Sequence, residues 1–247
     1  LADTWTQLAT NGEIEPDSYS NGGTVEQLEK SCATVLGKER AVFMPTGTLA
    51  NHLAVRELAA EHGRAIVQAE SHLYNDSGDC VQTLSNMPLV ALGPNQASFS
   101  IEQLEAAVER ADTGRVATPI RVISVETPVR RRFGETFDGN QLERVVSFAK
   151  QREISLHLDG ARIFLQAAYE NRPVSDYTAP FDTVYVSLYK YFNAPSGAIL
   201  AGPRSLLDGM FHTRRMFGFA ALPRIRNVHS VFVAFSHFDP PSPLFSS

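Results

Sequence analysis

Two apolar runs separated by a lysine-containing turn decide the fold: DTVYVSLYKYFNAPSGAILAG, residues 182–202. The runs DTVYVSL (182–188) and GAILAG (197–202) are short and bounded by turn residues, which predicts two buried strands. Lys190 lies between two tyrosines at the end of the first run. Because lysine is almost never fully buried without a partner, the sequence raises the question of what role a lysine has at this position.

The same kind of apolar run recurs along the chain and alternates with helical patterns. The other predicted strands are AVFM (41–44), AIVQA (65–69), PLVAL (88–92), RVISVE (121–126) and ISLHLD (154–159). Segments with apolar residues at helical spacing are 49–63, 100–111 and 139–153. This alternation predicts an α/β fold with a mostly parallel sheet and helices on both faces. In such sheets, ligands bind at the carboxyl ends of the strands.

The composition excludes several classes of protein. The 247 residues carry a formal net charge of -5, so we expect neither a nucleic-acid partner nor an anionic membrane surface. No apolar run reaches the roughly 18 residues of a membrane span. Cys32 and Cys80 match no metal or redox spacing, which favours a reducing compartment and a cytoplasmic location without a metal site. The chain begins at Leu1 rather than Met, which leaves a removed leader open.

The stretch FMPTGTLAN (43–51) passes from a predicted strand to a predicted helix through Thr46, Gly47 and Thr48. Backbone N–H groups, hydroxyls and the positive end of the helix dipole together suit a phosphate. An ordinary helix N-cap explains the same residues equally well. Neither GxGxxG nor GxxxxGK occurs in the chain, so this loop is the candidate phosphate site.

Two charged residues follow the ends of neighbouring strand patterns. Asp159 ends the strand in LHLDGARIF (156–164), where a carboxylate needs a positive partner to offset its desolvation. A structural salt bridge to Arg162 is one such partner. Lys190 lies at the end of the next strand, where an apolar setting favours the neutral amine that forms imines. Alternatively, its stem extends past the tyrosines and its ammonium group reaches water.

Together, the phosphate loop, the acid and the lysine predict pyridoxal 5'-phosphate as cofactor. The loop would anchor the phosphate, Asp159 would keep the pyridine nitrogen protonated, and Lys190 would hold C4' as a Schiff base. The three features in this order are more specific than any one of them.

These motifs resemble the threonine aldolase and β-eliminating lyase family, whose members are pyridoxal-phosphate-dependent lyases of fold type I. The resemblance covers about residues 17–218 through VFMPTGTLAN, LHLDGAR, VSLYKYFNAPSGAILAG and RRMFG. It implies an N-terminal arm (1–25) and a cofactor-binding large domain (26–205). Residues 206–247 would then be an interdomain helix followed by a truncated or divergent remnant of the small C-terminal domain.

The resemblance also implies roles for individual residues. Lys190 would carry the cofactor, and Asp159 would pair with its pyridinium nitrogen. Gly47 and Thr48 would bind the phosphate, and Arg162 would contact the cofactor or the substrate carboxylate.

Two further roles come from the resemblance alone. His72 in ESHLYND matches the family histidine that stacks on the cofactor ring and is a candidate catalytic base, although a structural histidine is the alternative. Arg214 matches a basic position near a cofactor phosphate at the dimer interface. The family's sites form between two subunits, so we expect a homodimer or homotetramer.

The sequence departs from the family pattern in three places. Val129 replaces the histidine of the family's Glu-Asn-Thr-His segment, which approaches the substrate β-hydroxyl. Ser77 stands where the family has an acid, and residues 219–221 replace a glycine-rich run. The resemblance also leads us to expect that much of the family's small C-terminal domain is absent from this sequence.

The leading hypothesis is a pyridoxal-phosphate-dependent carbon–carbon lyase whose small-molecule substrate is an amino acid. Like threonine aldolase, it would cleave the Cα–Cβ bond of a β-hydroxy-α-amino acid into glycine and an aldehyde. One alternative is β-elimination or another amino-acid lyase step, which the valine at position 129 favours. The other alternative is a non-catalytic, truncated homologue.

Overall fold

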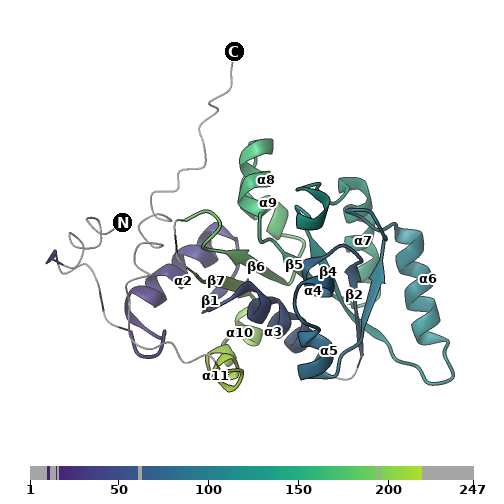
Figure 1. Ribbon diagram of the computed structural model, residues 1–247, viewed down its shortest axis with the longest axis horizontal. Helices are drawn as coiled ribbons and strands as arrows, with labels where there is room; N and C mark the ends of the chain where they lie inside the picture. The colour runs from purple at the N-terminus through teal and green to yellow at the C-terminus, as the bar shows by residue number, and fades with distance from the viewer. Residues whose placement is uncertain are drawn as a thin grey trace, which may run out of the picture.

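All seven predicted strands form one seven-stranded sheet in the computed structural model, which describes residues 10–11, 15, 17–60, 63–192, 194 and 196–218. The strands are β1 (Arg40–Met44), β2 (Arg64–Gln68), β3 (Leu89–Leu92), β4 (Ile120–Glu126), β5 (Ser155–Asp159), β6 (Thr183–Ser187) and β7 (Ala198–Gly202). Their order across the sheet is β1-β7-β6-β5-β4-β2-β3 (Figure 1).

The sheet is mostly parallel, as predicted. Strands β3, β2, β4, β5 and β6 pair in parallel, whereas β7 is antiparallel to both β6 and β1. Glu126, Asp159 and Tyr185 are therefore neighbours across β4, β5 and β6. Because β7 runs the other way, its first residue, Ala198, pairs with the last residues of β1 and β6. The sheet thus brings the ends of the motif-bearing strands to one edge.

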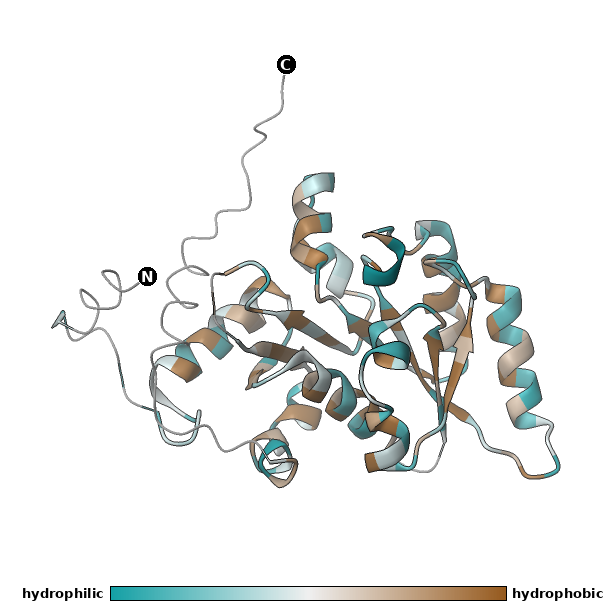
Figure 2. Ribbon diagram, in the orientation of Figure 1, coloured by the Kyte–Doolittle hydropathy of each residue, from teal (hydrophilic) through white to brown (hydrophobic). Residues whose placement is uncertain are grey.

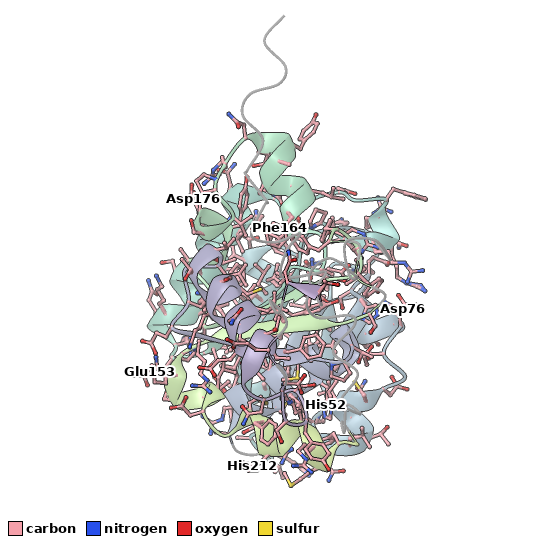
Figure 3. The ribbon with its side chains drawn as sticks, turned by 90° about the vertical axis from the view of Figure 1, so that its left-hand side faces the viewer. His52, Asp76, Glu153, Phe164, Asp176 and His212 are labelled. Atoms are coloured by element: carbon pink, nitrogen blue, oxygen red, sulfur yellow. The ribbon has the colours of Figure 1, made fainter. Side chains whose placement is uncertain are left out.

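Helices cover both faces of the sheet (Figure 1). On one face lie α2 (Gly23–Val35), α6 (Ile101–Asp112), α7 (Gly139–Gln151), α8 (Ile163–Glu170) and α9 (Val174–Thr178). On the other lie α3 (Gly47–Ala59), α4 (His72–Asn75), α5 (Cys80–Ser85), α10 (Arg204–Leu207) and α11 (Met210–Met216). Figure 3 shows Phe164 and His52 on opposite sides of the sheet.

The strands are apolar on both sides because both faces are covered. Along β7, Ile199 and Ala201 belong to the core under α2, and Ala198 and Leu200 to the core under α3. The hydrophobic strands lie between helices that are polar on their outer sides (Figure 2). This burial explains why the strands appear in the sequence as continuous apolar runs.

The helix boundaries follow local signals. Ser100 caps α6 by accepting a hydrogen bond from the backbone of Gln103, whose side chain accepts one from Ser100 N in return. Within the described ranges, no helix is both long and apolar enough to cross a membrane.

The chain ends are described only in part. Residues 17–22 form bends before α2 begins, and α10 and α11 follow the sheet. Most of the predicted arm, the departure at 219–221 and the rest of the C-terminal segment lie outside the described residues. The division into segments at 25 and 205 stays a prediction.

Candidate active site

A cavity of about 240 Å³ lies at the carboxyl edge of the parallel strands. Six of the seven site residues expected from sequence line it: Gly47, Thr48, His72, Asp159, Arg162 and Lys190. Asp159 is the last residue of β5, and the others come from the segments that follow β1, β2, β5 and β6. The cavity therefore lies where ligands bind in this class of sheet.

The loop after β1 lines one side of the cavity. Thr46 is an N-cap, since its hydroxyl oxygen accepts a hydrogen bond from Leu49 N at 3.2 Å. A Cβ atom on Gly47 would overlap the side chain of Tyr185. Only glycine therefore lets the start of α3 approach β6 this closely. The N-cap role of Thr46 does not prevent this loop from binding an anion. Gly47 and Thr48 still line the cavity at a helix N-terminus, where anions bind.

Asp159 lies on the cavity wall with both carboxylate oxygens hydrogen-bonded. Oδ2 accepts from Asn51 Nδ2 at 2.5 Å, and Oδ1 accepts from Ala161 N at 3.1 Å. The residue is only 2% exposed, and this burial raises its pKa, while the charges of His72 and Lys190 oppose the rise. Asp159 makes no ion pair with Arg162 in the described part of the chain, so the salt-bridge alternative is not realised.

Lys190 is half-buried and lines the cavity from the turn after β6. Its Nζ lies 5.3 Å from the ring centroid of Tyr189. The neighbouring Tyr191 donates a hydrogen bond from its hydroxyl to Ala161 O at 2.7 Å. This bond joins the segment that carries Lys190 to the one that follows Asp159.

His72 is held by its backbone, which leaves its ring available. It begins α4, and its backbone N–H donates to Glu126 Oε2 at 2.6 Å. The ring atom Nδ1 is buried and has no hydrogen-bond partner among the described residues. An unsatisfied nitrogen beside a cavity suits a group that accepts a proton from a ligand.

Glu126 is a site residue that sequence reasoning missed. Its second oxygen accepts from Arg130 N at 2.9 Å, so one carboxylate holds the backbones of both His72 and Arg130. Burial, and then the charge of Asp159, raise the pKa of Glu126 to about 7. The sequence did contain a signal for Glu126: like Asp159, it is an acidic residue at the end of an apolar strand.

Two other expected positions lie away from the cavity lining. Arg214, 1% exposed, donates to the backbone oxygens of Phe43 and Ser20 and lies 3.9 Å from the carboxylate of Glu29. Its contact with a cofactor phosphate at a dimer interface stays a prediction. Val129, the residue expected at the position of the family histidine, is fully buried and is not among the residues that line the cavity.

The lining fits pyridoxal phosphate in its chemistry. A helix N-terminus suits the phosphate, Asp159 suits a protonated ring nitrogen, and Lys190 offers an amine. A sheet edge without a ligand would need neither the unpartnered Nδ1 of His72 nor the close approach of α3 to β6 at Gly47. The site is thus equipped for reactions at the α-carbon of an amino acid.

Known proteins resemble this chain in sequence and in fold. The low-specificity L-threonine aldolase 1 of Arabidopsis thaliana is 26% identical over 220 residues, which cover 87% of this chain and 61% of the plant protein. A solved structure from Listeria monocytogenes, described as a candidate L-allo-threonine aldolase, superposes with a TM-score of 0.83 at 29% identity. That match covers 96% of this chain and 65% of the Listeria chain.

The fold extends to more distant enzymes. A structure of SPT that holds PLP as an internal aldimine has a TM-score of 0.66 at 19% identity, covering 86% of this chain and 50% of that one. The chain thus spans less than two thirds of the length of these proteins. Residues 4–221 match the family model of the β-eliminating lyases. The chain therefore belongs to the β-eliminating lyase family, whose cofactor is pyridoxal phosphate.

Proposed function

We propose that this chain forms the cofactor-binding part of a lyase that cleaves a β-hydroxy-α-amino acid into glycine and an aldehyde. The observation that carries the proposal is the convergence of six expected residues, from four separate segments, on one cavity. The names of the relatives, threonine aldolases, support the same reaction.

Bound pyridoxal phosphate supplies an electron sink for the electrons of the broken Cα–Cβ bond. Gly47 and Thr48 would bind its phosphate, and Lys190 would hold C4'. Asp159 would accept a hydrogen bond from the protonated ring nitrogen and so maintain its positive charge.

The remaining residues would act on the amino acid. Arg162 would bind the substrate carboxylate, because its guanidinium group offers two parallel donors. The unpartnered Nδ1 of His72 would accept the proton of the β-hydroxyl group. Glu126 would fix the position of His72 through its backbone N–H. The amine of Lys190, once displaced by the substrate, would lie near Cα and return a proton there.

The cofactor assignment is tested by adding pyridoxal phosphate to the purified chain and recording its absorbance before and after borohydride reduction. Peptide mapping should then find the reduced label on Lys190. The variant Lys190→Ala should take up no label there and lose turnover. A variant with full activity and an unchanged imine absorbance would refute the role of Lys190.

A second reaction, β-elimination, is favoured by one observation. Val129, at the position of the family's β-hydroxyl-directed histidine, is buried and offers no proton-transfer group. The two reactions release different products from a β-hydroxy-amino acid. Aldehyde and glycine would support aldol cleavage, whereas ammonia and a keto acid would support β-elimination.

We further propose that the protein works as a homodimer or homotetramer in the cytoplasm. Sedimentation at micromolar concentration should show an assembly larger than a monomer, and a monomer alone would contradict this. Fractionation of cells that produce the protein tests the location.

A further inference from the structure

A buried chain of hydrogen bonds runs from Asp159 through the layer between the sheet and α3. Asn51 Nδ2 donates to Asp159 Oδ2 at 2.5 Å, and Asn51 Oδ1 lies 2.9 Å from His157 Nε2. His157 Nδ1 lies 2.8 Å from the hydroxyl oxygen of Thr183. Asn51, His157 and Thr183 are each 0% exposed. Because burying polar side chains is costly unless they are hydrogen-bonded to one another, this connected set calls for an explanation.

The direction of each bond follows from what its atoms can do. An amide oxygen only accepts, so the proton between His157 and Asn51 belongs to His157 Nε2. Burial lowers the pKa of His157 to about 3, so the ring is neutral and its Nδ1 carries no proton. The hydroxyl of Thr183 therefore donates to Nδ1. The chain points one way, from Thr183 to Asp159.

This direction matches a charged Asp159. If the amide of Asn51 were reversed, its oxygen would face the carboxylate and repel it. The proton on His157 Nε2 prevents that reversal, because in the reversed amide the N–H₂ group of Asn51 would face this proton, so that two donors would meet. The tautomer of His157 thus determines which end of Asn51 faces Asp159.

Asp159 needs this support because some of its neighbours favour its charged form and others oppose it. His72 and Lys190 favour the charged form, whereas Glu126, one strand away, opposes it, as does burial. Arg162 also lines the cavity, and the hydroxyl of Tyr185 lies on the neighbouring strand. Donors on the side away from the cavity stabilise the carboxylate without occupying the face that meets a ligand.

We propose that Thr183, His157 and Asn51 are positioning residues that hold Asp159 as a carboxylate, aimed at the ring nitrogen of the cofactor. The inference rests on the proposed role of Asp159 in binding that nitrogen.

The chain offers a matched control for testing it. His52 is also buried, lies on α3 beside Asn51, and has its Nε2 2.7 Å from the hydroxyl oxygen of Ser85. Figure 3 shows it low on the α3 side of the sheet, near α11. His52→Phe and His157→Phe each remove one imidazole with a hydroxyl partner, but only the second affects the bond to Asp159.

The first experiment measures the dissociation constant of pyridoxal phosphate by absorbance titration of the full chain. Asn51→Leu should raise it about tenfold, the equivalent of one lost hydrogen bond to a charged group. His157→Phe should raise it about threefold to tenfold. His157→Gln, whose amide can still donate to Asn51, should restore it to within about twofold of the parent value. Equal effects of His52→Phe and His157→Phe, or no effect of Asn51→Leu, would overturn the inference.

The second experiment needs no cofactor. Nitrogen-15 NMR of the unmodified chain without ligand should show one histidine, absent from His157→Gln, as neutral with its proton on Nε2. A proton on Nδ1, or a charged ring at neutral pH, would overturn the inference. If the chain took up no cofactor at all while this signal was found, the proposed function would fail and the hydrogen-bond chain would stand.

Discussion

The side chain of Tyr185 occupies the position that a Cβ atom on Gly47 would need. Strand β6 and the start of α3 are therefore packed together at the candidate phosphate site, with no room for a methyl group. Gly47 has an ordinary helical backbone, so contact alone, and not a left-handed conformation, requires glycine.

Gly47→Ala should lower the free energy of unfolding by about 1–3 kcal/mol, because overpacking displaces Tyr185. It should also weaken cofactor binding. Gly139→Ala is the control: Gly139 also begins a 13-residue helix but has nothing within 4 Å of its Cβ position. We expect that change to be neutral or slightly stabilising. Urea unfolding of both variants measures the difference, and equal effects would contradict the close packing at Gly47.

Glu29 should make stability depend on pH. Burial raises its pKa to about 7 from an ordinary value of 4.5. Between these values the folded state binds more protons than the unfolded state, so this contribution is complete below pH 4.5 and is lost as the pH rises through 7.

Glu29→Gln removes that titration. The free energy of unfolding of this variant, relative to the parent, should rise by about 3 kcal/mol between pH 4.5 and pH 8. Urea unfolding across this range measures it. The comparison with the parent cancels His52 and His157, whose lowered pKa values act in the opposite direction. A pH-independent difference would show that Glu29 titrates normally.

Arg214 should stabilise the fold. It joins α11 to the backbone of β1 and to Ser20, while buried beside Glu29. Arg214→Gln should lower the free energy of unfolding by about 2–4 kcal/mol, since it leaves two buried carbonyl groups without their donor and removes the ion pair with Glu29. The exposed neighbour provides the control, because Arg215→Gln should change it by less than about 0.5 kcal/mol. A loss of stability in Arg214→Gln as small as that in Arg215→Gln would contradict the stabilising role of Arg214.

Restoring the family histidine at position 129 should not improve aldol cleavage. Val129 is fully buried and is not among the residues that line the cavity, so Val129→His should cost about 1–3 kcal/mol of stability. Val116→His, at an 83% exposed position, should cost almost nothing. Aldehyde release and thermal unfolding test both variants. Faster aldehyde release by Val129→His would mean that this segment can reach the substrate.

The strands and the helices 47–59, 101–112 and 139–151 were predictable because burial determines where apolar residues lie in the sequence. Asp159 and Lys190 were predictable for a related reason: charged residues at the ends of buried strands are costly without a ligand or partner. Family resemblance was needed for His72, whose local sequence carries no comparable signal.

The missed features depend on contacts between distant segments. Asn51 lies within a helical pattern, and His157 within a strand, so neither stands out until the two meet across 106 residues of sequence. Glu126 follows the same strand-end rule as Asp159, but its contact with His72 joins segments 54 residues apart. The direction of β7 was not predictable, because short apolar runs do not encode which neighbours they pair with.

The position of β7 has a consequence for biosynthesis. Among the strands that the structure describes, β1 is synthesised first and pairs with β7 alone, whose residues are made more than 150 positions later. Until then β1 has no pairing partner among the described strands, and the phosphate loop that follows it is not yet joined through β7 to β6. Such long-range pairing is slow and exposes strand edges to aggregation. Cofactor capture must therefore follow synthesis of nearly the whole described chain, and a nascent chain halted before residue 198 should bind none.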